Sequence, residues 1–195
     1  DRETGYEQVA PTVYALVAAI DAKDSFTFQH STNVSQYAVL LAQKLGVSRD
    51  DIQTVKVAGL LHDIGKIGIP ESILKKAGKL TNEEYEIMKS HVEKSIEMIH
   101  YLPNMNYVIP AVVSHHERYD GKGYPRGLKG EEIPFLGRIL AVCDSFDAMI
   151  SKRAYKEPLS VEYAMGELEK NKGTQFDPKA ADAFIELIKE GKVPL

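Results

Sequence analysis

The sequence lacks the features that mark disulfide-rich, exported and membrane-spanning proteins. Its single cysteine, Cys143, excludes an internal disulfide framework. No apolar run approaches the roughly 20 residues that a membrane helix needs. The N-terminal run is acidic and has no basic start before its short apolar stretch, so it does not resemble a signal peptide. We therefore expect a protein of the reducing cytoplasm, without a membrane segment.

An excess of basic charge is also lacking. The chain has 24 lysines and arginines against 28 aspartates and glutamates, which gives a net charge of -4. Proteins that bind nucleic acid polymers are usually basic, so we expect no such polymer among the partners. Phosphate groups would have to be bound by metals or by a few local cations.

The length and composition are those of a globular protein. With 195 residues, 44% hydrophobic and 27% charged, the chain can bury a core as one domain. The polar start favours a connector helix over residues 1–25, followed by a single domain over residues 26–195. We also expect the chain to be a fragment of a larger regulated protein.

Helical spacing dominates the sequence, and no convincing strand is visible. The apolar stripe from Val34 to Leu45 advances in steps of three and four, and Gly46 is expected to end that helix. Ser48 and Thr81 have the signatures of N-caps, and the helix after Thr81 is expected to run toward His100. The remaining helices are expected at residues 9–22, 106–115, 136–150, 161–170 and 178–189. The predicted fold is all-α, with a long glycine-containing loop over residues 117–133.

Histidine and aspartate recur at the predicted helix ends. His62-Asp63 and His115-His116 are adjacent pairs, and Asp144 lies near the middle of a predicted helix. Each signal is weak alone, since a single histidine such as His91 is more often structural. Together they suit Mn, Fe, Ni or Zn, and a carboxylate beside a histidine could bridge two such ions.

Three motifs together resemble the HD-GYP subfamily of the HD superfamily. They are HDIGKIGIPESIL at 62–74, HHERYDGKGYP at 115–125 and DSFDAMISKRAYK at 144–156. The resemblance extends from about residue 30 to residue 184 and implies an HD-superfamily helical bundle, with a GYP loop and an additional C-terminal helical segment. The motif set is specific, although the HD dipeptide alone is not.

The resemblance implies a centre of two divalent metal ions, with iron or manganese favoured. Asp63 would bridge the ions. The other implied ligands form two sets, namely His30, His62 and Asp144 on one ion and His91, His115 and His116 on the other. Asp147, one helical step from Asp144, is expected to orient a ligand. His100 is interpreted as a surface or helix-end residue and Cys143 as core packing.

The same resemblance implies the substrate contacts. Lys66 follows Asp63 by about one turn, so it should point at the same cluster, contact the scissile phosphate and help the leaving oxygen. Arg153 and Lys156 resemble phosphate-binding cations, although ordinary solvated charge remains the alternative. Gly123 and Tyr124 belong to the loop that would line the cleft, where glycine permits close approach and positive φ.

The sequence departs from the family pattern before and after His30. Phe26 stands where some members have a carboxylate that holds a third metal, so we predict two metals. Asn33 replaces a frequent arginine, which removes an ion pair and leaves open how firmly His30 is held. Gln29 replaces a small residue, so the sequence also leaves undecided the conformation of the local turn.

The resemblance implies a phosphodiesterase that hydrolyses cyclic di-GMP to linear pGpG, with further cleavage to GMP left open. Cyclic GMP-AMP is the alternative substrate. A second alternative is a signalling module that binds cyclic di-GMP or a diguanylate cyclase domain without hydrolysis. A nucleotidase or dNTP hydrolase of the HD type is less favoured because it would lack the second and third motifs. A homodimer is a further expectation.

Overall fold

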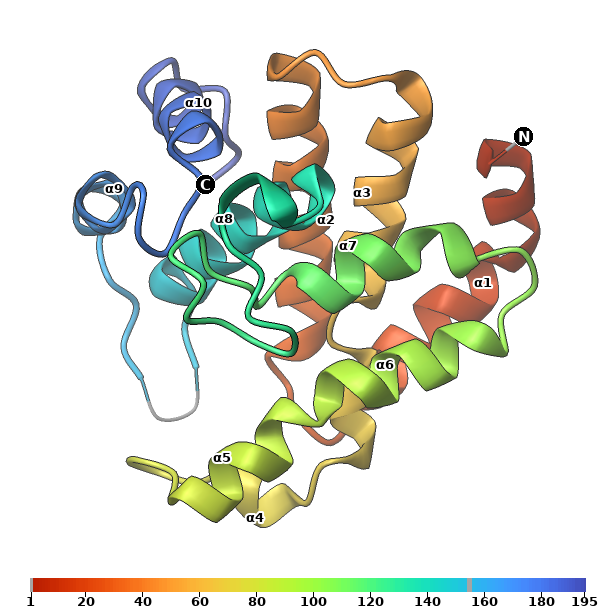
Figure 1. The fold of residues 1–195 in the computed structure, drawn as a ribbon. Helices are drawn as coiled ribbons and strands as arrows, with labels where there is room; N and C mark the ends of the chain where they lie inside the picture. The colour runs from red at the N-terminus through yellow and green to blue at the C-terminus, as the bar shows by residue number, and fades with distance from the viewer. Residues whose placement is uncertain (1, 154–155) are drawn as a thin grey trace.

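The computed structural model describes residues 2–153 and 156–195, and its regular elements in these ranges are helices. Apart from isolated bridges such as Arg153 with Lys156, the described residues contain no strand, which confirms the all-α prediction. None of the described helices is long and apolar enough to cross a membrane. In chain order the elements in Figure 1 are α1 (Arg2–Asp21), α2 (Thr27–Lys44), α3 (Arg49–Leu61), η1 (Ile64–Gly68), α4 (Glu71–Leu74), α5 (Asn82–Lys89), α6 (His91–His100), η2 (Asn106–Val108), α7 (Ile109–Ser114), η3 (Gly130–Glu132), α8 (Phe135–Ile150), α9 (Val161–Lys170) and α10 (Pro178–Lys189).

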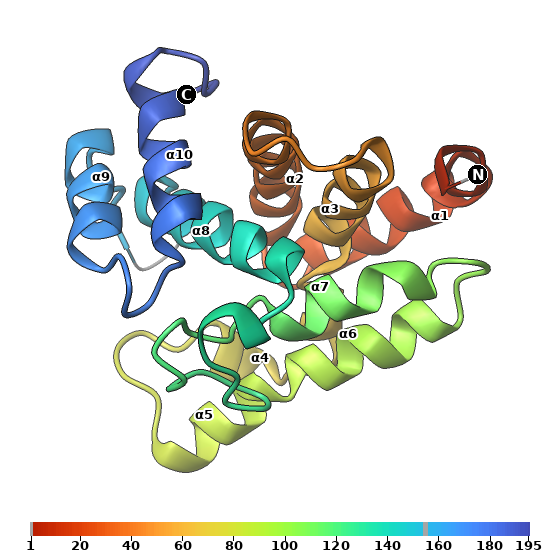
Figure 2. The same cartoon turned by 45° about the horizontal axis from the view of Figure 1, so that its top comes forward.

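Helix α2 is central because it packs on α3, α8, α1 and α10. Its predicted stripe is buried in the core, where Tyr37 meets Phe146 of α8 and Phe184 of α10 with ring centroids 5.7 and 5.9 Å away. Burying each such ring contributes on the order of 1.5–3 kcal/mol. Figure 2 shows α9 and α10 at one end of the molecule and α1 at the other. The packing around α2 therefore ties the two ends to one core.

Side-chain caps place the helix starts where the sequence predicts them. The Ser48 hydroxyl accepts from the Asp51 amide at 3.1 Å, and Thr81 forms a capping box with Glu84. Gly46 has φ 72°, the left-handed conformation that ends α2. These local signals are reliable because they involve residues only three positions apart.

The helix expected to run from Thr81 to His100 is divided at Ser90. Helix α5 has no buried residue, whereas α6 buries His91, Val92, Ser95 and Ile99. The Ser90 hydroxyl donates a hydrogen bond to the Ile87 carbonyl. Such a local side-chain bond competes with the backbone hydrogen bonds that would continue the helix. The break lets α6 follow the core while α5 lies outside it.

Helix α1 begins earlier than predicted, at Arg2 rather than Val9. It packs on α3 and α2, and Val13, Val17 and Ile20 are fully buried in the common core. The division into a connector at residues 1–25 and a domain at residues 26–195 stays a prediction.

Candidate metal centre

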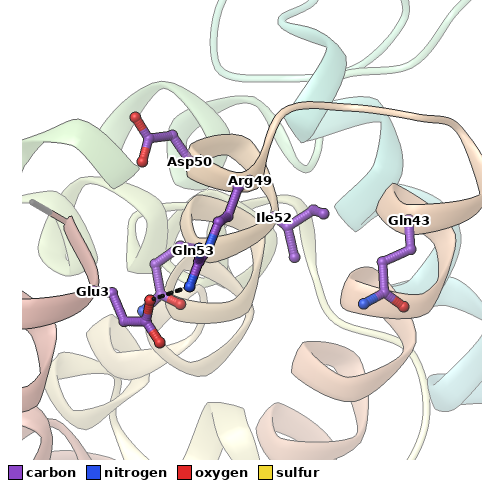
Figure 3. Close-up of a pocket in the computed structure, with 6 residues that line it drawn as sticks. All are labelled: Glu3, Gln43, Arg49, Asp50, Ile52 and Gln53. Atoms are coloured by element: carbon purple, nitrogen blue, oxygen red, sulfur yellow. Dashed lines mark hydrogen bonds and ion pairs between the residues drawn. The ribbon is translucent and has the colours of Figure 1, made fainter.

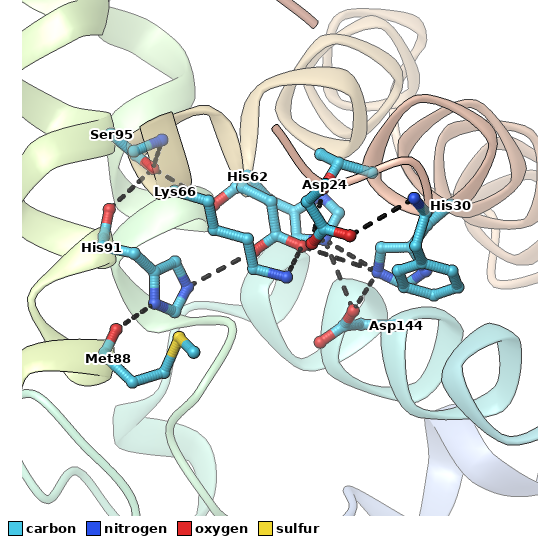
Figure 4. Close-up of polar contacts among 12 residues, drawn as sticks. Asp24, His30, His62, Lys66, Met88, His91, Ser95 and Asp144 are labelled. Carbon is cyan, nitrogen blue, oxygen red and sulfur yellow. Dashed lines mark hydrogen bonds and ion pairs between the residues drawn. The ribbon is translucent and has the colours of Figure 1, made fainter. Parts of the chain in front are cut away.

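Two groups of four side chains, which share Asp63, converge where α2, α3, α6, α7 and α8 meet. In each group, atoms that could bind a metal all lie within 4.8 Å of one another. The first group is His30, His62, Asp63 and Asp144, and the second is Asp63, His91, His115 and His116. Figure 4 shows His30, His62, His91 and Asp144 directed toward one region. The structure thus brings together every ligand that the family resemblance implies.

The Asp63 carboxylate lies between the two groups. Its Oδ2 is 3.1 Å from Nε2 of His62 and 3.7 Å from Nε2 of His30, whereas Oδ1 is 3.3 Å from Nε2 of His91. Asp144 closes the first group, with Oδ1 2.7 Å from Nε2 of His30. A carboxylate with one oxygen toward each histidine set has the geometry of a bridging ligand.

Hydrogen bonds at Nδ1 orient the histidine rings. Nδ1 of His62, His91 and His115 donates to the carbonyls three residues earlier in the chain, at 2.6, 2.7 and 2.5 Å. A carbonyl can only accept, so Nδ1 carries the hydrogen in each ring and Nε2 is left as a ligand atom. Nε2 of His115 is buried and has no hydrogen-bond partner among the described residues. A buried, unpartnered nitrogen of this kind fits a metal site.

The first group is held from outside by a chain of hydrogen bonds. Asp147, fully buried in α8, has Oδ2 2.7 Å from Nδ1 of His30. The Asn33 amide donates to Oδ1 of Asp147 at 2.9 Å, and the Gln29 amide donates to the Asn33 oxygen at 2.8 Å. The two departures near His30 are therefore joined in one uncharged chain of hydrogen bonds that ends on Asp147. Their contact with α8 could not be seen from the sequence, because 114 positions separate Asn33 from Asp147.

The electrostatics of the two groups differ. Burial opposes charging of His62 and His30, but nearby carboxylates outweigh it: the pKa of His62 is raised to about 10, chiefly by Asp63, and the pKa of His30 is raised by Asp144 and Asp147. Burial also opposes ionisation of Asp63 and Asp144, yet the histidines hold the pKa of both carboxyls well below its usual range.

In the second group, burial dominates the protonation of the histidines. It lowers the pKa of His116 to about 4 and the pKa of His115 well below its usual range, and neighbouring histidines add to the effect at His115. Both rings are therefore neutral near pH 7, which is the form that binds a metal.

The implied substrate cations lie on one side of the centre. Nζ of Lys66 is 3.3 Å from Oδ2 of Asp63, as expected from their spacing. The guanidinium of Arg153 lies 4.1 Å above the Phe26 ring, whose centroid is 4.6 Å from that of His30. Lys156 and Arg153 line the same pocket as Lys66. Residues 154 and 155 of the third motif lie outside the described residues.

The GYP loop covers the second group. The Tyr124 ring stacks on His116 with centroids 4.8 Å apart, and the Tyr124 amide donates to the His116 carbonyl at 3.2 Å. Gly123 does not use the positive φ that glycine permits. Glycine is needed there for space, because an added Cβ would collide with the His116 carbonyl and the Glu117 backbone.

Glu117 is a loop-holding residue that sequence reasoning missed. Its buried carboxylate accepts the amides of Arg126 at 3.0 Å and Leu128 at 3.1 Å. The only available signal was its position directly after His115-His116. Its partners lie 9 and 11 residues away across an irregular loop, so their position could not be predicted from helical spacing.

The other singled-out residues lie away from the centre. His100 ends α6, and its Nδ1 is 3.1 Å from the Asn106 side-chain oxygen. Cys143 is fully buried in the core. A separate pocket lies near the start of α3, where Arg49 pairs with Glu3 at 3.2 Å (Figure 3). Among the described residues, neither group of possible metal ligands includes a residue of this pocket.

Comparison with known proteins identifies similar sequences and folds. A sequence profile of the HD domain family matches residues 15–180. The chain is 44% identical over 190 residues to a cyclic di-GMP phosphodiesterase of Thermotoga maritima, covering 96% of this chain and 52% of that protein. It is 41% identical over 181 residues to the cyclic di-GMP phosphodiesterase response regulator RpfG of Xanthomonas campestris, with 92% and 48% covered. The chain thus spans about half the length of these relatives.

A third relative and one solved structure are named for cyclic GMP-AMP and not for cyclic di-GMP. The chain is 40% identical over 187 residues to 3'3'-cGAMP-specific phosphodiesterase 2 of Vibrio cholerae, covering 95% of this chain and 35% of that protein. A crystal structure of a cyclic GMP-AMP specific phosphodiesterase of V. cholerae superposes with a TM-score of 0.73 at 20% identity, covering 93% of this chain and 49% of the other. At that identity the structure supports the helical fold alone.

Proposed function

The chain belongs to the HD domain family, and we propose that it is a metal-dependent phosphodiesterase that opens cyclic di-GMP to linear pGpG. The observation that carries the proposal is the position of Asp63, with one carboxylate oxygen toward each histidine group. The names of the relatives from T. maritima and X. campestris favour the same reaction.

The donor set fits two divalent ions. Imidazole nitrogens with few carboxylates favour iron or manganese over magnesium or calcium. Asp63 would bridge the ions, with His30, His62 and Asp144 on one and His91, His115 and His116 on the other. When bound, such a pair activates water and neutralises charge on a phosphoryl group. Phe26 has no ligand atom and stacks on His30, which supports two ions rather than three.

The protein's own residues would orient the phosphodiester. Lys66 lies beside Asp63, so its ammonium can contact a phosphate oxygen at the centre and offset charge on the leaving oxygen. Arg153 and Lys156 would bind phosphate at the same side. Tyr124 and Gly123 would form the opposite wall, over His116.

The first test is metal content and product analysis with cyclic di-GMP, under anaerobic conditions with iron or manganese supplied. We expect about two ions per chain and the appearance of pGpG. Asp63→Ala should lose most of the metal and essentially all turnover, because both groups lose their shared carboxylate.

The control for this test is His100→Ala, which removes a histidine outside both groups. It should keep the metal content and turnover of the unchanged protein. Full activity in Asp63→Ala would refute the proposed centre. Metal-loaded protein that binds cyclic di-GMP without cleaving it would instead support the non-hydrolytic signalling module.

Cyclic GMP-AMP is the second candidate substrate, favoured by the names of the V. cholerae relatives. Competition between the two cyclic dinucleotides in one reaction decides the preference, and analysis at long times decides whether pGpG is cleaved to GMP. A homodimer, a diguanylate cyclase partner and a cytoplasmic location stay predictions from the sequence.

A further inference from the structure

One pocket of this acidic protein is rich in cations. Half of the described residues that line it are lysine or arginine, although the whole chain has a net charge of -4. The cations come from three separate segments, namely η1, the loop after α4 and the segment after α8. They are Lys66, Lys75, Lys76, Lys152, Arg153 and Lys156. Such a concentration focuses a positive field in one place and favours an anionic ligand.

The pocket adjoins the candidate metal centre through three of its lining residues. Lys66 lies 3.3 Å from Asp63, and the Phe26 ring stacks on His30. The Met88 carbonyl accepts from Nδ1 of His91 at 2.7 Å. Figure 4 shows Met88 next to His91, and Lys66 among the candidate ligand side chains. A ligand at the centre can therefore extend directly into the pocket.

Several of the cations are not neutralised by the protein. Lys76 forms an ion pair with Glu84 at 2.5 Å, but Lys75 has only a long contact of 3.8 Å with Glu71. Lys152 is exposed and has no acidic partner within ion-pair distance among the described residues. Neither Lys75 nor Lys152 is among the substrate contacts that the family resemblance implies. Both side chains therefore remain available to a ligand.

Phe26 is unsuited to bind a nucleobase by stacking. One neighbour of its ring is His30 and another is the Arg153 guanidinium, 4.1 Å from the ring centroid. The ring therefore acts as a spacer that holds Arg153 beside the centre. This leaves charge, rather than aromatic stacking, as the chemistry that the pocket offers.

We propose that Lys75 and Lys152, two cations of this pocket outside the contacts that the family resemblance implies, bind the second, uncleaved phosphodiester of a cyclic dinucleotide. The inference rests on the proposed function. A cyclic dinucleotide carries two phosphodiesters in one ring, and only one can lie at the metal centre. The other must lie beside it, where the pocket supplies cations with a volume of about 370 Å³. The same cations would retain the linear product.

The test compares two substrates in the metal-loaded protein. Cyclic di-GMP has two phosphodiesters, whereas bis(p-nitrophenyl) phosphate has one and so lacks the group that Lys75 and Lys152 would bind. In Lys75→Ala/Lys152→Ala we expect kcat/KM for cyclic di-GMP to fall about tenfold or more, from loss of two charged contacts. The fall for bis(p-nitrophenyl) phosphate should be much smaller. Lys79→Ala, in the same loop but outside the pocket lining, is the matched control and should change neither substrate.

A binding measurement separates this inference from the proposed function. We would titrate the same variants with a phosphorothioate analogue of cyclic di-GMP and expect weaker binding in the double variant only. Weaker binding without turnover of cyclic di-GMP by the unchanged protein would support the subsite and refute the phosphodiesterase. Equal losses of kcat/KM for both substrates would overturn the subsite. The lysines would then affect the metal centre or attract anions in general, without binding the second phosphodiester. Unchanged binding and turnover in the double variant would also overturn it.

Discussion

The two histidine groups that share Asp63 are built differently. The first, with His30, His62 and Asp144, is rich in carboxylates, and its histidines have raised pKa values. The second, with His91, His115 and His116, contains Asp63 as its only carboxylate. Burial keeps the pKa values of His115 and His116 low. Without metal, His62 in the first group is therefore protonated near neutral pH, whereas His115 and His116 in the second group are already in the neutral form that binds a metal.

The supports of the two groups differ as well. His30 is held by the buried side chain of Asp147, which Asn33 holds in turn. His116 is covered by Tyr124, on a loop that the Glu117 carboxylate holds through backbone amides. The comparison shows that similar ligands can be positioned by a packed helix or by an irregular loop. It also predicts that each group can be weakened separately.

Among the substitutions, the largest selective effect is expected from Asn33→Asp. The substitution keeps the size of the side chain but places a second carboxylate beside Asp147, where an amide now donates. Like charges there should displace Asp147 from His30 and weaken metal binding by the first group by about 10–100-fold. The second group should be unaffected. Two-step metal titration by calorimetry measures this difference.

The control for Asn33→Asp is Asn104→Asp, in the exposed loop after α6. It adds the same charge away from Asp147 and should leave both binding steps unchanged. If Asn33→Asp weakened both binding steps equally, the prediction that the two groups can be weakened separately would be wrong.

Acidification should sharpen the comparison between the groups. Metal binding must displace a proton from His62, because its pKa, raised to about 10, keeps the ring charged near neutral pH; the pKa of His30 is raised as well. The affinity of the first group should therefore fall by about tenfold per pH unit for each proton released as the pH is lowered from 8 to 6. His115, whose pKa is lowered, and His116, with a pKa of about 4, release no proton over that range, so the affinity of the second group should fall less than that of the first.

Calorimetry in buffers of different ionisation enthalpy counts the protons released in each binding step. Proton release confined to one binding step would support the assignment of the protonated histidine to the first group. Equal release in both steps would contradict it.

A smaller effect is expected from Glu117→Gln in the second group. Glutamine keeps one accepting oxygen but turns an N–H donor toward one of the amides of Arg126 and Leu128. Loss of one buried hydrogen bond should loosen the loop and weaken metal binding by the second group about three- to tenfold. Hydrogen exchange of the loop amides should become faster.

Glu132→Gln is the matched control for Glu117→Gln. Glu132 also accepts a backbone amide, that of Lys129 at 3.0 Å, but it is exposed. Glu132→Gln should therefore alter neither metal binding nor hydrogen exchange of the amides near Tyr124. Slow exchange retained in Glu117→Gln would show that other contacts hold the loop.

Local structure and ligand chemistry were predictable from the sequence alone. Ser48, Thr81 and Gly46 placed helix ends correctly because capping acts over about one turn. The motifs around His62, His115 and Asp144 identified the family and a candidate ligand set. Residue type, helical spacing and motif resemblance were sufficient for these predictions.

Tertiary structure alone decided how those residues meet. It directed the two oxygens of Asp63 to different groups, joined Asn33 to Asp147, and gathered Lys75, Lys152 and Lys66 around one pocket. It also divided α5 from α6 at Ser90, because only α6 packs against the core. These contacts join residues far apart in the chain, so they depend on how the helices pack and not on the preferences of each segment.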